Sequence, residues 1–159
     1  MGDDTVDVLD RGSDMNVQSI LAAKGSDVAT IAQTSTLADA VQQLRDRGIG
    51  ALVVSSDDRA IEGILSERDV TRSLAAHGAS ALGRTVGSAM STDVVTCSSA
   101  DGVERLMMLM TDRRIRHLPV VDDDGHLAGI ISIGDVVKSR LSELESENKA
   151  LFEYITHGR

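Results

Sequence analysis

The chain has 159 residues, an apolar fraction of 42% and a formal net charge of −9, which suits one compact domain or two small lobes. The acidity argues against general affinity for nucleic-acid backbones, and the lack of an apolar run of about 18 residues argues against a membrane span. Phe152 and Tyr154 are the only aromatic residues, so the core must be aliphatic. The acidic N-terminus is no secretory signal and Cys97 is a lone cysteine, so we predict a cytoplasmic protein in which Cys97 is a small buried hydrophobe in a strand.

Residues 1–16 are rich in Asp and Gly without periodicity, which predicts a disordered acidic arm. A short helix is expected over 17–23, ending at Lys24-Gly25. Apolar residues then recur first at strand spacing and next at spacings of three and four. We expect a strand, a helix, a buried strand, a third strand and a second helix, at 28–31, 37–44, 51–54, 61–65 and 68–76.

The same pattern occurs twice, because residues 27–72 reappear without a gap as residues 93–138. The second copy predicts a short helix, a strand, a helix, two strands and a final helix, at 86–90, 94–97, 103–110, 117–121, 127–131 and from 134 onward. Aspartate-rich segments between the last two strands of each copy, Asp57-Asp58 and Asp122-Asp123-Asp124-Gly125, indicate hairpin turns. A duplication of this length indicates two copies of one structural unit, so each site in one copy should have a counterpart in the other.

Each copy is a β-α-β-β-α unit, which has too few layers to bury both faces of its sheet. We therefore predict an α/β (α+β) fold in which two pseudo-symmetric units pack sheet to sheet, followed by a C-terminal helix. The predicted segments are the arm, the first unit, a linker, the second unit and a helical tail, at 1–16, 17–78, 79–84, 85–140 and 141–159.

Both copies end in the pattern Gly-hydrophobic-hydrophobic-Ser-x-x-Asp. Ser66 and Ser132 fall where a strand turns into a helix, and free N–H groups at a helix start attract anions. Asp69 and Asp135 lie three residues further on, where a carboxylate can accept hydrogen bonds from sugar hydroxyls. A capping box, in which Ser and Asp bond to each other's backbone, is the structural alternative.

These endings, the Asp-Val-x-Thr openings and the segment 114–121 resemble a tandem cystathionine-β-synthase (CBS) domain pair, or Bateman module. The resemblance covers about 17–141. More specifically, the segments 66–70 and 131–138 look like those of small stand-alone bacterial CBS-pair proteins, which have no catalytic domain. It implies a regulatory module that binds AMP, ADP, ATP, NAD(H) or S-adenosylmethionine in two clefts between lobes. It also implies a homodimer and an unknown regulated protein as partners.

The resemblance assigns a role in nucleotide binding to several positions of this chain. Asp69 and Asp135 correspond to the ribose-binding aspartate, and Ser66 and Ser132 to the phosphate-side hydroxyl. The strand openings near the adenine and the loops before the second strand correspond to Thr30, Thr96, Gly50-Ala51 and Arg116-His117.

Basic residues gather near these motifs and form a candidate anion site: Arg68, Arg72, Arg113, Arg114, Arg116 and Lys138. We predict that Arg68, Arg116 and His117 converge on the cleft that holds Ser132 and Asp135, where they neutralise a phosphate. The other cleft should bind more weakly or prefer another ligand. A structural core histidine is the alternative for His117. Lys24 is expected at a cleft mouth. Arg72 and Lys138 are expected to face solvent or an interface.

Apolar residues continue in the tail at spacings of four and three, as a short heptad seam with Asn148 among them: Val137, Leu141, Leu144, Leu151 and Ile155. The seam predicts either a helix pair between two copies or a helix folded back on its own domain. The chain lacks a Walker loop, a metal-spaced His/Cys cluster and a nucleophile motif, so we expect no enzyme, catalytic cofactor or metal. A structural dimerisation module with vestigial clefts is the alternative function.

Overall fold

The computed structural model describes residues 15–157, so the acidic arm predicted over 1–16 falls outside this range except for Met15 and Asn16. The first repeat contains α1 (Val17–Lys24), β1 (Thr30–Ile31), α2 (Leu37–Arg47), β2 (Ala51–Val54), β3 (Gly63–Ser66) and α3 (Glu67–His77). A 3-10 helix, η1 (Gly78–Gly83), joins it to the second repeat. The second repeat contains α4 (Val86–Ala89), β4 (Cys97–Ser98), α5 (Val103–Arg113), β5 (His117–Val121), β6 (Leu127–Ser132) and α6 (Ile133–His157).

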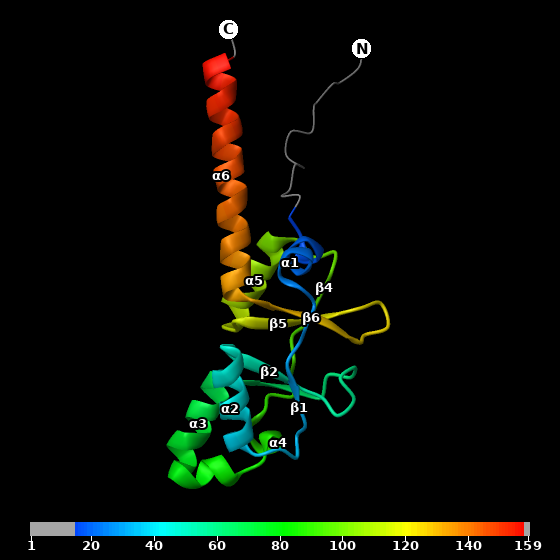
Figure 1. Cartoon of the computed structure of the whole chain (residues 1–159), viewed down its shortest axis with the longest axis vertical. Helices are drawn as coiled ribbons and strands as arrows, with labels where there is room; N and C mark the ends of the chain where they lie inside the picture. Colours follow the sequence, from blue (N-terminus) through cyan, green and yellow to red (C-terminus); the bar gives the residue numbers. More distant parts are fainter. Residues whose placement is uncertain (1–14, 158–159) are drawn as a thin grey trace.

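The predicted α/β architecture of two matching units is confirmed. Each repeat forms a three-stranded sheet, in the order β1-β2-β3 or β4-β5-β6, in which the first pair is parallel and the second antiparallel. The opening strands are shorter than predicted, because only two residues of each pair with the next strand. In Figure 1 the two sheets face each other across the middle of the molecule, with α1 and α5 outside one and α2, α3 and α4 outside the other.

Each sheet packs on its own aliphatic core. We call the sheet β1-β2-β3 with its helices the first lobe, whose core includes Leu37, Leu52, Leu65 and Val86. The second lobe is the sheet β4-β5-β6 with its helices, and its core includes Val17, Ile20, Leu118 and Ile131. Cys97 is buried in this second core, and desolvation raises the pKa of its thiol to about 12. The prediction of a buried, hydrophobe-like cysteine is therefore confirmed.

The two repeats exchange their first helices. Although α1 belongs to the first repeat, Val17 and Ile20 lie in the core of the second lobe, and the Val17 N–H donates to the carbonyl of Asp101 at 2.9 Å. Although α4 belongs to the second repeat, Val86 lies in the core of the first lobe, and its N–H donates to the carbonyl of Ser35 at 2.8 Å. Neither lobe is therefore built from one continuous repeat.

The predicted linker is part of the packed structure, since Ala81 of η1 is fully buried. The predicted tail continues the last helix of the second repeat without a break, as the 25-residue helix α6. Figure 1 shows α6 projecting well beyond the second lobe. Within residues 15–157, no helix combines the length and apolar character that crossing a membrane would need.

Candidate functional site

A serine and an aspartate fix the start of the last helix in each repeat. At α3, the Asp69 carboxylate accepts the Ser66 N–H at 2.8 Å and the Asp69 N–H donates to the Ser66 hydroxyl at 3.3 Å. At α6, Asp135 and Ser132 form the same two bonds at 2.9 and 3.2 Å. The capping-box alternative is therefore realised twice. It also holds each carboxylate at a helix start, where the backbone favours anions.

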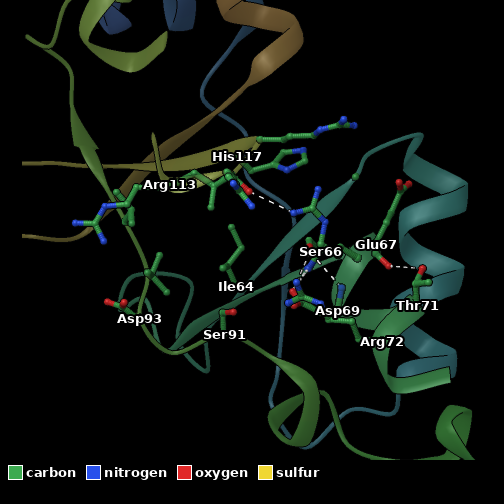
Figure 2. Close-up of a pocket in the computed structure, with 17 residues that line it drawn as sticks. Ile64, Ser66, Glu67, Asp69, Thr71, Arg72, Ser91, Asp93, Arg113 and His117 are labelled. Atoms are coloured by element: carbon green, nitrogen blue, oxygen red, sulfur yellow. Dashed lines mark hydrogen bonds between the residues drawn. The ribbon is translucent and has the colours of Figure 1, made fainter. Parts of the chain in front are cut away.

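A pocket of about 690 Å³ lies between the two lobes, and we call it the first cleft. The first repeat contributes Gly50, Ile64, the start of α3 (66–69), Thr71 and Arg72 to its lining. The second repeat contributes Ser91, the segment 93–95 that precedes β4, and the segment 113–117 that leads into β5. Figure 2 shows Ser66, Asp69 and Arg72 on one side of this pocket and Asp93 and Arg113 on the opposite side. Its volume lies in the range of small-molecule sites, about 300–1,000 Å³.

The first cleft gathers positive charge in an acidic protein. Five arginines line it, against three carboxylates: Arg68, Arg72, Arg113, Arg114 and Arg116, against Glu67, Asp69 and Asp93. One of these arginines also joins the repeats, because the Arg68 guanidinium donates to the carbonyl of Arg114 at 3.3 Å. Guanidinium groups match phosphate oxygens in geometry and charge, so the first cleft can hold a phosphate.

His117 lies at the first residue of β5, half-buried at the edge of the first cleft. A side chain on Gly50 would approach the imidazole ring to 3.1 Å, so the glycine leaves the space that the ring fills. Burial lowers the pKa of His117, and the nearby carboxylates of Glu67 and Asp135 only partly oppose this. The ring is therefore neutral at pH 7 and can offer one hydrogen-bond donor and one acceptor.

Arg68, Arg116 and His117 all line the first cleft, which holds Ser66 and Asp69. His117 also lies beside the second Ser-Asp pair, because it is opposite Ser132 in the sheet and the Asp135 carboxylate acts on the pKa of its ring. The predicted convergence of these three residues on Ser132 and Asp135 stays a prediction. Arg72 and Lys138, expected to face solvent or an interface, are both exposed, and Arg72 also lines the first cleft. A repeat alignment pairs equivalent residues, but it cannot show which end of one lobe faces which helix of the other.

Ser132 and Asp135 are the counterparts of Ser66 and Asp69 in the second repeat, and we call their surroundings, where the repeat predicts a twin site, the second cleft; a side chain of the protein contacts Asp135 there. The Lys24 ammonium forms an ion pair with the Asp135 carboxylate at 2.7 Å and donates to the carbonyl of Ile130 at 2.9 Å. Desolvation opposes ionisation of Asp135, but hydrogen bonds from Lys24 and Ser132 outweigh it, so the pKa of Asp135 lies below its usual value. Lys24 therefore lies beside Asp135, and its place at the mouth of a ligand cleft stays a prediction.

Three other predicted residues lie outside the lining of the first cleft. The Thr30 hydroxyl donates to the Asp58 carboxylate, Thr96 is exposed just before β4, and Ala51 is buried opposite Ser66 in the sheet. Their roles in binding stay predictions. The sequence interpretation missed the contribution of residues 93–95, although they begin the repeated Asp-Val-x-Thr opening and so carried a signal.

Asp122, Asp124 and His126 are the described residues whose ligand atoms come close enough to suggest a metal, within 4.8 Å of one another. The Asp122 carboxylate already accepts the N–H groups of Asp124 and His126, at 3.0 and 2.8 Å. These bonds close the β5–β6 turn that the sequence predicted. The turn therefore accounts for the cluster.

Comparisons with known proteins identify both repeats. The family model for the CBS domain matches residues 22–76 and 86–142. A mitochondrial CBS domain-containing protein of Arabidopsis thaliana is 39% identical over 127 residues, which cover 77% of this chain but only 61% of that protein. The chain thus spans about three fifths of this relative.

Solved structures share the fold. A CBS-domain containing protein from Agrobacterium tumefaciens is 42% identical, with a TM-score of 0.77 over 82% of this chain and 96% of that one. A CBS domain protein from Pyrobaculum aerophilum, complexed with AMP, has a TM-score of 0.67 over 76% of this chain and 89% of that one. Its identity is 23%, so this second likeness concerns the fold alone.

Proposed function

Because this chain belongs to the CBS-domain family and carries two CBS domains in tandem, we propose that it is a regulatory module that binds an adenosine nucleotide in the first cleft. The observation that carries the proposal is the meeting of five arginines with the capped start of α3 in one pocket. In a chain of net charge −9, such a concentration of positive charge favours an anionic ligand.

The first cleft offers a partner for each part of a nucleotide. The arginines, led by Arg68 and Arg116, would bind the phosphate. The Asp69 carboxylate would accept hydrogen bonds from the ribose hydroxyls, in place of its present bond from the Ser66 hydroxyl at 2.9 Å. Apolar side chains that line the same pocket would contact the base: Ile64, Val94, Val95 and Ile115. AMP, ADP, ATP and NAD(H) all share these three parts.

Ligand binding at this position would act on the arrangement of the lobes. The first cleft is lined by both repeats, and Arg68 bridges them through the carbonyl of Arg114. A phosphate that draws Arg68 away from this carbonyl would replace a direct contact between lobes by one through the ligand. A ligand that binds one arrangement of the lobes more tightly shifts the population towards it, and a partner protein would respond to that shift.

Isothermal titration with AMP, ATP, NADH and S-adenosylmethionine tests the proposal. We expect micromolar binding of at least one phosphate-bearing ligand, weakened by added salt because the arginines are exposed to solvent. The uncharged nucleoside adenosine is the matched control and should bind more weakly, since it lacks the phosphate. If the folded protein binds none of these ligands, the proposal fails.

The structural dimerisation module stays as a second candidate, because the Ser-Asp pairs serve as helix caps in both repeats. A cap stabilises a helix whether or not a ligand binds. Thermal unfolding separates the two functions. A ligand that binds the native state raises the unfolding midpoint in proportion to the logarithm of its concentration, whereas a vestigial cleft gives no shift.

We also propose that the chain forms a homodimer through α6. The heptad seam is exposed rather than folded back, with Leu141 56%, Leu151 58% and Ile155 68% exposed. Asn148 interrupts the seam at an a-type position. Two parallel copies of α6 would pair Asn148 with itself, amide to amide, whereas an antiparallel pair would bury it against leucine.

Charges placed in the seam test the dimer. The double variant Leu151→Glu and Ile155→Glu should convert the dimer to a monomer in light scattering, because like charges would meet across the helix pair. Both side chains are exposed in the single chain, so the fold should not change. Lys149→Glu with Thr156→Glu, outside the seam on the same helix, is the matched control. An unchanged dimer in the seam variant would contradict the proposal.

A further inference from the structure

The two clefts differ in what meets the third strand of each sheet. At the first cleft, the backbone of Ser91 pairs with that of Ile64 in both directions, at 3.0 and 2.9 Å. At the second cleft, the Lys24 ammonium donates to the carbonyl of Ile130, the counterpart of Ile64, and also pairs with Asp135. A charged side chain therefore lies in the second cleft where the first has backbone.

The difference follows from the lengths of the exchanged helices. Helix α1 has eight residues and α4 has four, so α1 continues for one more turn towards β1. Lys24 is the last residue of that turn, and the chain leaves it through Gly25, whose φ is 96°. The glycine conformation, which side chains rarely adopt, ends α1 with Lys24 beside Asp135.

Lys24 engages the groups that a nucleoside would need. Asp135 corresponds to Asp69, the proposed acceptor for ribose hydroxyls, and its carboxylate accepts the ammonium at 2.7 Å. By contrast, no ion pair involves Asp69 among residues 15–157; its carboxylate accepts only the neighbouring Ser66 groups. An ion pair that is only partly exposed, with 32% of the Lys24 side chain and 22% of the Asp135 side chain accessible, competes effectively with hydroxyl donors.

We propose that Lys24 occupies the second cleft and keeps the Asp135 carboxylate from accepting hydrogen bonds from a ligand, so that the chain binds one nucleotide rather than two. The inference rests on the proposed function of the first cleft. Removing the ammonium would leave the Asp135 carboxylate without its cation. The arginines that the sequence predicted for this cleft line the first cleft and would not replace the lost charge. The opened cleft would then take a neutral nucleoside rather than a phosphate-bearing one.

Titration of the full chain with AMP and with adenosine tests this inference. Wild type should bind one AMP per chain. Lys24→Met keeps the length of the side chain without its charge, and it should gain one adenosine site per chain relative to wild type. Adding Asp135→Asn to Lys24→Met should abolish that gain. Lys149→Met, which removes an exposed lysine from α6, is the matched control and should gain no site.

The possible failures are distinguishable. A wild type that already binds two ligands, or a Lys24→Met variant that gains none, overturns the role of Lys24. A wild type that binds nothing, with a gain in Lys24→Met, supports the role of Lys24 but overturns the proposed function of the first cleft. As a readout that needs no ligand, NMR titration of the Asp135 carboxyl carbon should show a higher pKa in Lys24→Met; an unchanged pKa would contradict the ion pair in solution.

Discussion

Asp69→Asn is expected to weaken nucleotide binding about 10- to 100-fold, because hydrogen bonds to a charged group contribute about 1.5–3 kcal/mol and each 1.4 kcal/mol is about tenfold in affinity. Asparagine keeps the size of the side chain and still offers one oxygen to the Ser66 N–H. It loses the negative charge and replaces one acceptor by a donor, which no longer suits a pair of ribose hydroxyls. Isothermal titration with the best ligand of the wild type measures the loss.

The control for Asp69→Asn must separate a lost contact with the ligand from a weakened helix cap. Asp39 provides it, because it forms the same capping box with Thr36 at the start of α2, at 3.3 and 3.2 Å, outside the lining of the first cleft. Asp39→Asn should lower stability about as much as Asp69→Asn, roughly 1 kcal/mol, and leave binding intact. Equal losses of binding in both variants would show that Asp69 acts only through the cap.

Ile20→Ala is expected to lower the free energy of unfolding by about 2–5 kcal/mol, the usual effect of truncating a buried isoleucine. Ile20 is only 6% exposed and lies in the core of the second lobe, although it belongs to the first repeat. Hydrogen exchange should therefore lose more protection in β4, β5 and β6 than in β1, β2 and β3. Urea unfolding followed by circular dichroism measures the total effect.

Gln18→Ala is the matched control for Ile20→Ala, because Gln18 lies on the exposed side of the same helix. A surface change of this kind should alter the free energy of unfolding by no more than about 0.5 kcal/mol. If Ile20→Ala instead lowers protection mainly in β1, β2 and β3, the exchange of first helices is not present in solution. Equal loss in both sheets would indicate that the lobes unfold as one unit.

The sequence by itself determined the repeated β-α-β-β-α unit and the serine and aspartate at each helix start. Strands β2 and β5 are buried on both faces and therefore form short continuous apolar runs in the sequence, so their positions were predicted without error. The capping residues were predictable for a related reason, since Ser66 and Asp69 bond to backbone within three residues of themselves. Interactions between residues that are close together in the chain can therefore be predicted from the sequence.

Only the tertiary structure decided which residues meet across the lobes. The exchange of α1 and α4, the gathering of arginines around Asp69 rather than Asp135, and the ion pair of Lys24 with Asp135 all join segments far apart in the chain. Each residue of one repeat has a counterpart in the other. For each contact between the lobes, the sequence alone therefore left two candidate partners. The packing of the lobes selected one of them, because each exchanged helix buries its apolar side chains in the partner lobe's core and thereby fixes which loops face which helix.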